Sequence, residues 1–162
     1  MNEMIYIGKT VSTFGIKGEL KVISDFEYCD RAYQIDKKIL INNIEHVISG
    51  IRYHKNYVLL KIDNLNNIND ILKYVGFNIY IKRIDLGLKE DEYLYKDLIN
   101  SDVIDDDNTK LGKVIEILNG NNVLIKVKGT KEFFIPLIDN YINKFDLDKK
   151  ILYTKNAKEL IL

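Results

Sequence analysis

The sequence predicts a mainly all-β protein with two small β-barrels joined by a short linker. Apolar and polar residues alternate through most of the chain, glycine and asparagine turns separate strand-sized segments, and a polar stretch divides the chain near its middle. The 162 residues are enough for two domains of about 80 residues each. Closing a sheet into a barrel removes exposed strand edges, which favours barrels for halves of this size.

The first half alternates with a period of two through most of its length. We expect strands over residues 4–12, 18–24, 38–41, 45–53 and 57–62. The turns between the last three are Asn42-Asn43 and Lys55-Asn56, since asparagine tolerates the left-handed backbone that tight hairpins need.

One segment of the first half has a helical period. Apolar residues occur at i, i+3, i+4 and i+7, at Ile68, Ile71, Leu72 and Val75. Asn66 or Asn67 can cap the start of this helix, and Gly76 can end it. Alternation then resumes, which predicts a closing strand that contains Phe77, Ile79 and Ile81.

A polar segment, residues 85–92, separates the halves. The predicted domains are therefore residues 1–84 and 92–162, with 85–91 as the linker. In the second half we expect strands over residues 110–118, 122–128, 132–136, 141–145 and 151–154. Gly120 marks a hairpin turn, Pro136 ends a strand because it has no N–H to donate, and the tail can form one helical turn. A single larger barrel is the alternative, and the charged linker argues against it.

The charge balance excludes a strongly basic nucleic-acid binder. The chain has 24 basic and 24 acidic residues; residues 1–88 have 12 and 10, and residues 89–162 have 12 and 14. If RNA is a partner, a protein is expected to share its recognition. With one cysteine, no apolar run long enough for a membrane span and no signal-peptide pattern at the N-terminus, we expect a cytoplasmic protein without disulfides.

The chain lacks the residue clusters of catalytic or metal centres. His46 and His54 are expected as ordinary surface residues, and Cys29 has no nucleophile motif around it. Residues 105–108, Asp-Asp-Asp-Asn, lack the alternating ligands and terminal glutamate of a calcium loop, so we expect a solvated turn. The sequence therefore predicts a protein that is not an enzyme, with no catalytic residue, no metal and no cofactor.

Gly15 and Gly18 bracket Ile16 and Lys17 between the first two expected strands. Glycine permits a positive φ and a close backbone approach at such positions. Two interpretations stay open: a plain β-hairpin turn, or a binding loop that displays Phe14 and Lys17 near its tip.

This loop resembles the N-terminal signature of the RimM family of ribosome maturation factors. In that family a strand leads into His-Gly-Leu-Lys-Gly-Glu, and residues 15–19 here read Gly-Ile-Lys-Gly-Glu. Phe14 stands where the family usually has His, and Thr13 where it often has Pro or Ala. Residues 67–81 are similar to the short helix, glycine and last strand that close the family's first barrel.

The second half resembles the family's PRC-barrel. Residues 92–99, Glu-Tyr-Leu-Tyr-Lys-Asp-Leu-Ile, are similar to its opening, Glu-Tyr-Tyr-Trp-x-Asp-Leu-Ile, from which Leu94 and Tyr95 depart. Residues 111–114 and 134–137 match later PRC-barrel positions. The resemblance runs in order over nearly the whole chain.

The resemblance implies a non-catalytic assembly factor for the head of the small (30S) ribosomal subunit that supports 16S rRNA processing. The implied partners are small-subunit ribosomal protein S nineteen and the 16S rRNA of the subunit precursor. No membrane partner is implied, and we expect a monomer. Two other functions stay open: a general RNA-binding β-barrel module, and a PRC-barrel scaffold of another complex.

Candidate contact residues occur in both halves. Tyr93, Tyr95 and Asp97 are candidates for binding the ribosomal protein, although packing between linker and barrel is an equal alternative for the two tyrosines. The candidates for the loop motif and for rRNA contact are Lys9, Phe14, Gly15, Lys17, Gly18, Glu19, Lys21 and Arg52.

Overall fold

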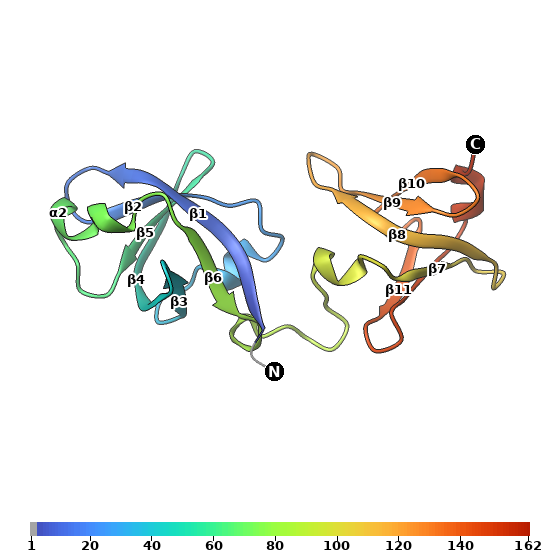
Figure 1. The fold of residues 1–162 in the computed structure, drawn as a ribbon, viewed down its shortest axis with the longest axis horizontal. Helices are drawn as coiled ribbons and strands as arrows, with labels where there is room; N and C mark the ends of the chain where they lie inside the picture. Colours follow the sequence, from blue (N-terminus) through green and yellow to red (C-terminus); the bar gives the residue numbers. More distant parts are fainter. Residues whose placement is uncertain (1–2) are drawn as a thin grey trace. The chain divides into compact units, whose positions relative to one another are not determined.

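The computed structural model describes residues 3–162 and divides into two compact units, Met1–Leu88 and Lys89–Leu162 (Figure 1). Both units consist mainly of β-strands, which confirms the predicted fold class. The strands form two separate sheets, so the alternative of one larger barrel is wrong.

The first unit is a closed antiparallel barrel of six strands. They are β1 (Met4–Phe14), β2 (Glu19–Ile23), β3 (Lys38–Ile41), β4 (Ile44–His54), β5 (Tyr57–Ile62) and β6 (Asn78–Lys82). The order around the barrel is β1-β2-β5-β4-β3-β6, so β1 closes the sheet against β6. Register shifts in β1 and β4 mark bulges, which bend long strands around a small barrel.

Alternate residues of these strands fill the barrel. Leu20, Val22, Leu60, Ile62 and Ile79 are fully buried. The predicted strands agree with the observed ones to within two residues, and β3 and β5 have the predicted bounds. Alternation located these strands because each has one face in the core and one face outside.

The helical segments of the first unit are short: α1 (Cys29–Ala32), α2 (Ile68–Ile71) and the 3₁₀ helices η1 (Leu72–Tyr74) and η2 (Arg83–Leu86). Asn67 caps α2, and Gly76 has φ +91°, both as predicted. The predicted apolar face was partly wrong, because Leu72 is 53% exposed. Ile71 is buried, as predicted, but the helix tightens to three residues per turn at Leu72, so Tyr74 takes the buried side in place of Leu72.

The second unit is a six-stranded sheet in the order β10-β9-β8-β7-β12-β11. Its strands are β7 (Asp102–Ile104), β8 (Lys110–Leu118), β9 (Leu124–Lys128), β10 (Glu132–Pro136), β11 (Ile142–Asp146) and β12 (Ile151–Thr154). The pairing of β12 with β7 is parallel and the others are antiparallel. The 3₁₀ helices η3 (Tyr95–Leu98) and η4 (Ala157–Leu160) precede and follow the strands.

The core of the second unit consists of apolar side chains from both ends of its sequence, including Leu98, Val114, Val127, Ile135 and Leu152. As predicted, β10 ends at Pro136 and the tail contains one helical turn. The sequence did not predict β7, whose three residues are too few to show alternation.

Candidate nucleic-acid interface

The loop between β1 and β2 is anchored to the chain that leads into α2. Gly18 has φ +90°, and a Cβ there would lie 2.4 Å from the carbonyl oxygen of Leu65. The N–H of Ile68 donates to the carbonyl of Ile16 at 3.0 Å. Gly15 has φ +65° and open space around it, so glycine is needed at this position only for the backbone conformation of the turn. The loop is therefore a hairpin turn held in place from one side, with Ile16 74% exposed at its tip.

Beside this loop, the outside of the barrel carries what we term the cationic face: Phe14, Lys17, Glu19, Lys21, Arg52, His54, Tyr57 and Lys61. Strand register sets the arrangement, because paired residues lie on the same side of a sheet. Lys21 and Arg52 are both paired with Leu59, and His54 is paired with Tyr57. Leu59 is fully buried between the two long cationic side chains, whose stems can cover apolar surface while their charges stay in water.

A bidentate ion pair joins the loop end to β4. Arg52 donates from Nε to Glu19 Oε2 at 2.7 Å and from Nη2 to Glu19 Oε1 at 2.8 Å. The Glu19 side chain is 14% exposed and the Arg52 side chain 56%, so the carboxylate is fixed and the guanidinium faces solvent. The bond to Arg52 holds the pKa of the Glu19 carboxyl below its usual range, and Lys61 and Lys17 add to this effect.

Aromatic rings support the cations of this face. The Arg52 guanidinium lies 5.4 Å from the centroid of the Phe14 ring, and Lys21 Nζ lies 4.0 Å from that of Tyr57. His54 packs against the same Phe14 ring at 5.1 Å. Cation–π contacts of this length are favourable, so the ring faces hold the charges in defined places.

Four cations and one carboxylate make up the charges of the cationic face, and that carboxylate is paired. A hollow of about 280 Å³ at the loop is lined by Phe14, Ile16, Lys17, Glu19 and Arg52. The hollow is open to the surface, whereas small-molecule sites enclose most of their ligand. The arrangement fits a large anionic partner better than a small ligand.

The structure groups most of the predicted rRNA-contact residues and leaves one apart. Lys9 lies in the middle of β1, paired with Ile23 and Asn78, neither of which belongs to the cationic face. Sequence reasoning missed His54, Tyr57 and Lys61 as members of the face. The turn at Lys55-Asn56 could have identified the first two, since a two-residue hairpin turn places His54 opposite Tyr57.

The two histidines differ, and the expectation that both are surface residues was wrong for His46. It is 2% exposed, packs against the Tyr74 ring, and its Nδ1 lies 2.7 Å from Asp63 Oδ2. A histidine–carboxylate pair can serve catalysis, but burial keeps this ring from solvent, so we assign it to packing. Cys29 is half-buried, and burial raises the pKa of its thiol, which disfavours the nucleophilic thiolate.

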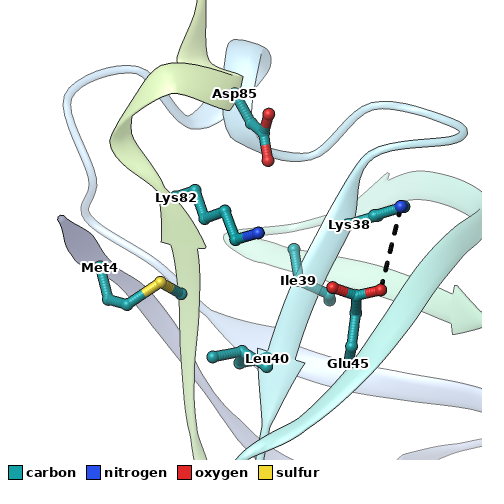
Figure 2. A pocket seen from close by; sticks show the side chains of 7 residues that line it. All are labelled: Met4, Lys38, Ile39, Leu40, Glu45, Lys82 and Asp85. Atoms are coloured by element: carbon teal, nitrogen blue, oxygen red, sulfur yellow. Dashed lines mark ion pairs between the residues drawn. The ribbon is translucent and has the colours of Figure 1, made fainter. Parts of the chain in front are cut away.

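A second hollow lies outside β3 and β6 (Figure 2). Lys38 and Lys82 reach over it with Glu45 and Asp85, and an ion pair of 4.0 Å joins Lys38 to Glu45. Mixed charges at close range cancel, so this hollow lacks the single-sign character of the cationic face.

The candidate residues of the second unit take part in its internal structure. Tyr93 is half-buried against the core, with its ring 5.2 Å from that of Phe145 in an edge-to-face contact. Asp97 is 7% exposed, and its Oδ2 accepts the N–H of Leu94 at 2.8 Å, which caps η3. Tyr95 is half-buried in η3. For Tyr93 the packing alternative is thus supported by a contact.

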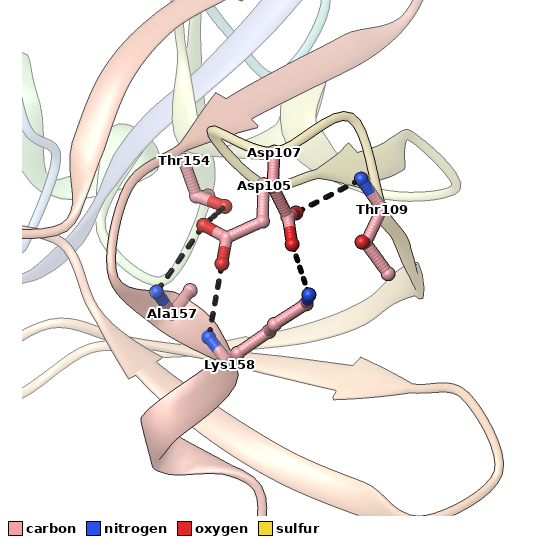
Figure 3. Close-up of polar contacts among 6 residues, drawn as sticks. All are labelled: Asp105, Asp107, Thr109, Thr154, Ala157 and Lys158. Carbon is pink, nitrogen blue, oxygen red and sulfur yellow. Dashed lines mark hydrogen bonds and ion pairs between the residues drawn. The ribbon is translucent and has the colours of Figure 1, made fainter.

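The acidic run after β7 is more than a solvated turn (Figure 3). Asp105 is 3% exposed and accepts three hydrogen bonds: from Thr154 Oγ1 at 3.0 Å, from the Ala157 N–H at 3.2 Å and from the Lys158 N–H at 3.1 Å. Asp107 pairs with the Lys158 ammonium, which lowers the pKa of its carboxyl to about 2. The expectation failed for Asp105 because its partners lie about fifty residues further along the chain. Its acceptor sites join β7 to η4.

The comparison with known proteins gives one family match for each of the two units. Residues 5–86 match the RimM N-terminal domain family, and residues 90–161 match the PRC-barrel domain family. The chain belongs to the RimM family. It is 37% identical to the ribosome maturation factor RimM of Staphylococcus haemolyticus (strain JCSC1435), over 91% of this chain and 93% of that one.

A Staphylococcus aureus RimM (strain bovine RF122 / ET3-1) is also 37% identical, over 93% of this chain and 95% of that one. Among solved structures, that of a putative 16S ribosomal RNA processing protein RimM from Pseudomonas aeruginosa aligns with 97% of this chain and 99% of that one, at 22% identity and a TM-score of 0.47. Within residues 3–162, no helix of this RimM-family chain is long and apolar enough to cross a membrane.

Proposed function

We propose that this protein is a non-catalytic ribosome maturation factor that acts in the cytoplasm on the head of the small ribosomal subunit. The observation that supports this most is the match to proteins named ribosome maturation factor RimM over more than nine-tenths of both chains. In this proposal, the first unit contacts 16S rRNA and the second unit holds small-subunit ribosomal protein S nineteen.

The cationic face supports the rRNA contact. Phosphate groups dominate the affinity of proteins for nucleic acids, and they are bound by lysine and arginine side chains at accessible positions. Lys17, Lys21, Arg52 and Lys61 meet this requirement together, although the chain as a whole has no net charge.

For the second unit, the argument from net charge is weaker than the sequence indicated. Residues 89–162 have 14 acidic side chains, but Asp97 and Asp105 are buried, which leaves 12 acidic against 12 basic. Exposed apolar side chains support the protein contact instead, among them Phe134 at 42%, Leu147 at 44% and Ile138 at 49%. Tyr95 stays a candidate contact, while Tyr93 and Asp97 shape the segment that presents it.

A factor of this kind acts through a population shift. It binds one conformation of a ribosomal protein and its rRNA more tightly than the others, and it shifts assembly by that difference in affinity. No bond has to be made or broken, which agrees with the burial of His46 and with the paired state of Glu19.

The test is a deletion strain, with ribosomal subunit profiles and 16S rRNA ends as the readout. We expect accumulation of small-subunit precursors and unprocessed rRNA ends, with rescue by the wild-type chain and by Lys38→Gln, and weaker rescue by Lys21→Gln combined with Arg52→Gln. Normal profiles together with an altered metabolite or a missing nucleotide modification would reject the assembly role.

A general RNA-binding module is the second candidate, because nothing in the cationic face distinguishes one RNA from another. Tagged protein recovered from cell extract separates the two. Enrichment of small-subunit precursors supports the maturation factor, and recovery of RNA in proportion to its abundance supports the general module.

A further inference from the structure

Two aromatic rings of the cationic face, Tyr57 and Phe14, each have a cation over them. Lys21 Nζ lies 4.0 Å from the Tyr57 centroid, and the Arg52 guanidinium lies 5.4 Å from that of Phe14. The second ring to contact Phe14 is His54, at 5.1 Å. Proteins that read single strands by stacking offer bare aromatic faces to the bases. Here each of the two rings already supports a charge.

Arg52 and Lys21 keep hydrogen-bond donors available for a partner. The two bonds to Glu19 use Nε and Nη2 of Arg52, and within residues 3–162 the structure shows no partner for its Nη1. Nor does any carboxylate in the described part of the chain pair with Lys21. A guanidinium fixed along one edge presents its other edge in a set direction, which suits a phosphate oxygen.

The groups that hold these cations are themselves held in place by the rest of the first unit. Glu19 is mostly buried at the start of β2, and the loop that precedes it is held by the close approach of Gly18 to Leu65. Lys61 is likewise tethered, because its Nζ donates to Asn66 Oδ1 at 2.8 Å. Side chains that are ordered before binding lose less conformational entropy when a partner arrives.

We propose that the cationic face binds the RNA backbone and not the bases, with Lys21 and Arg52 as phosphate contacts and with Tyr57, Phe14 and Glu19 as positioning residues that hold them. This inference rests on the proposed rRNA contact. Binding should depend strongly on salt and only slightly on sequence, and it should tolerate loss of the bases.

The experiment compares two probes with the full-length chain: a labelled mixed-sequence single-stranded RNA of about 12 nucleotides and an abasic oligoribonucleotide of the same length. We expect dissociation constants within about threefold of each other, and parallel plots of log affinity against log salt concentration. Binding of the RNA with no binding of the abasic probe would overturn the inference and leave the rRNA contact standing. If neither probe binds at low salt, both the inference and the proposed rRNA contact fail.

Variants then test whether Tyr57 holds the Lys21 side chain in place or stacks on the RNA bases. Lys21→Gln should weaken both probes and reduce the salt slope by about 0.7, the value for one phosphate contact on a single strand. Tyr57→Leu should weaken both probes equally, by about two- to fivefold, with the slope unchanged. Loss of binding to the base-containing probe alone would show that Tyr57 stacks on bases and would overturn the proposal.

Two further variants complete the set. Arg52→Lys keeps the charge but loses the planar guanidinium with its two donating edges, so we expect about threefold weaker binding at an unchanged salt slope. Unchanged affinity in this variant would contradict a role for the fixed guanidinium. Lys38→Gln removes a lysine from the β3 side of the same barrel and should leave both dissociation constants unchanged. Thermal melting of each variant excludes unfolding as the cause.

Discussion

In the first unit, the four cations of the cationic face project from the outside of a closed barrel, and Arg52 pairs with the one carboxylate among them, Glu19, whose side chain is 14% exposed. In the second unit, Asp97 and Asp105 turn inward and accept hydrogen bonds from backbone N–H groups. The same residue class therefore belongs to the proposed binding surface in one unit and holds the fold together in the other. A formal count of charges does not distinguish these two uses.

The comparison predicts its largest effect at Asp105. Asp105→Ala would leave the hydroxyl of Thr154 and the N–H groups of Ala157 and Lys158 without their acceptor. We expect a loss of about 4 kcal/mol in the free energy of unfolding of the second unit, measured by urea denaturation. Asp106→Ala is the matched control, since Asp106 is exposed, and it should change that free energy by less than about 0.5 kcal/mol. Equal effects would show that Asp105 does not act as a buried cap.

Gly18 tests how firmly the first unit holds its loop. Gly18→Ala places a Cβ 2.4 Å from the Leu65 carbonyl oxygen at φ +90°, so we expect a loss of about 3 kcal/mol in the free energy of unfolding. Gly15→Ala meets only the cost of a positive φ, about 1 kcal/mol, because nothing lies near its Cβ. Chemical denaturation of both variants checks the difference. If Gly15→Ala proves the more damaging, the proposed anchoring of the loop is wrong.

Tyr93 separates packing from partner contact in the second unit. Tyr93→Ala removes the edge-to-face contact with Phe145, and we expect a loss of about 2 kcal/mol of stability, since the ring is half-buried. Tyr95→Ala should weaken binding to ribosomal protein S nineteen, measured by calorimetry. Full-strength binding by a folded Tyr95→Ala chain would remove this tyrosine from the proposed contact.

The smallest expected effect is a shift in the titration of Glu19. The bond to Arg52 lowers the pKa of its carboxyl below the ordinary 4.5, so the pair stabilises the folded chain above that pH and loses its effect as pH falls through the lowered value. Carboxyl chemical shifts recorded against pH by NMR should give a midpoint below 4.5. In Arg52→Gln the midpoint should rise towards the ordinary value. An unchanged midpoint would mean that the ion pair does not persist in solution.

Alternation predicted most of the fold because burial on one face of a strand leaves a period of two in the sequence. It failed for β7, which has three residues, and for α1, whose four residues make only about one helical turn and so cannot show a 3.6-residue period. The family signature located the loop. Gly15 is needed there for its positive φ alone, whereas Gly18 is also needed for its close approach to Leu65, which the sequence does not show. The partners of Glu19, His46 and Asp105 lie 17 to 53 residues away and are joined only by the fold. That is why the burial of His46, the cap at Asp105 and the pairing of Glu19 with Arg52 were not predicted. Of the cationic face, Arg52 was predicted on β4, whereas His54, Tyr57 and Lys61 were missed.

The division of work between the two units is tested most directly by purification of the tagged full-length chain from cells. The wild-type protein should recover both precursor 16S rRNA and ribosomal protein S nineteen. After a wash at moderate salt and nuclease treatment, the double variant Lys21→Gln with Arg52→Gln should retain the ribosomal protein. Before nuclease treatment, it should recover at least about fivefold less rRNA than wild type, because two phosphate contacts are lost. Equal recovery of rRNA by the wild type and the variant would contradict the account.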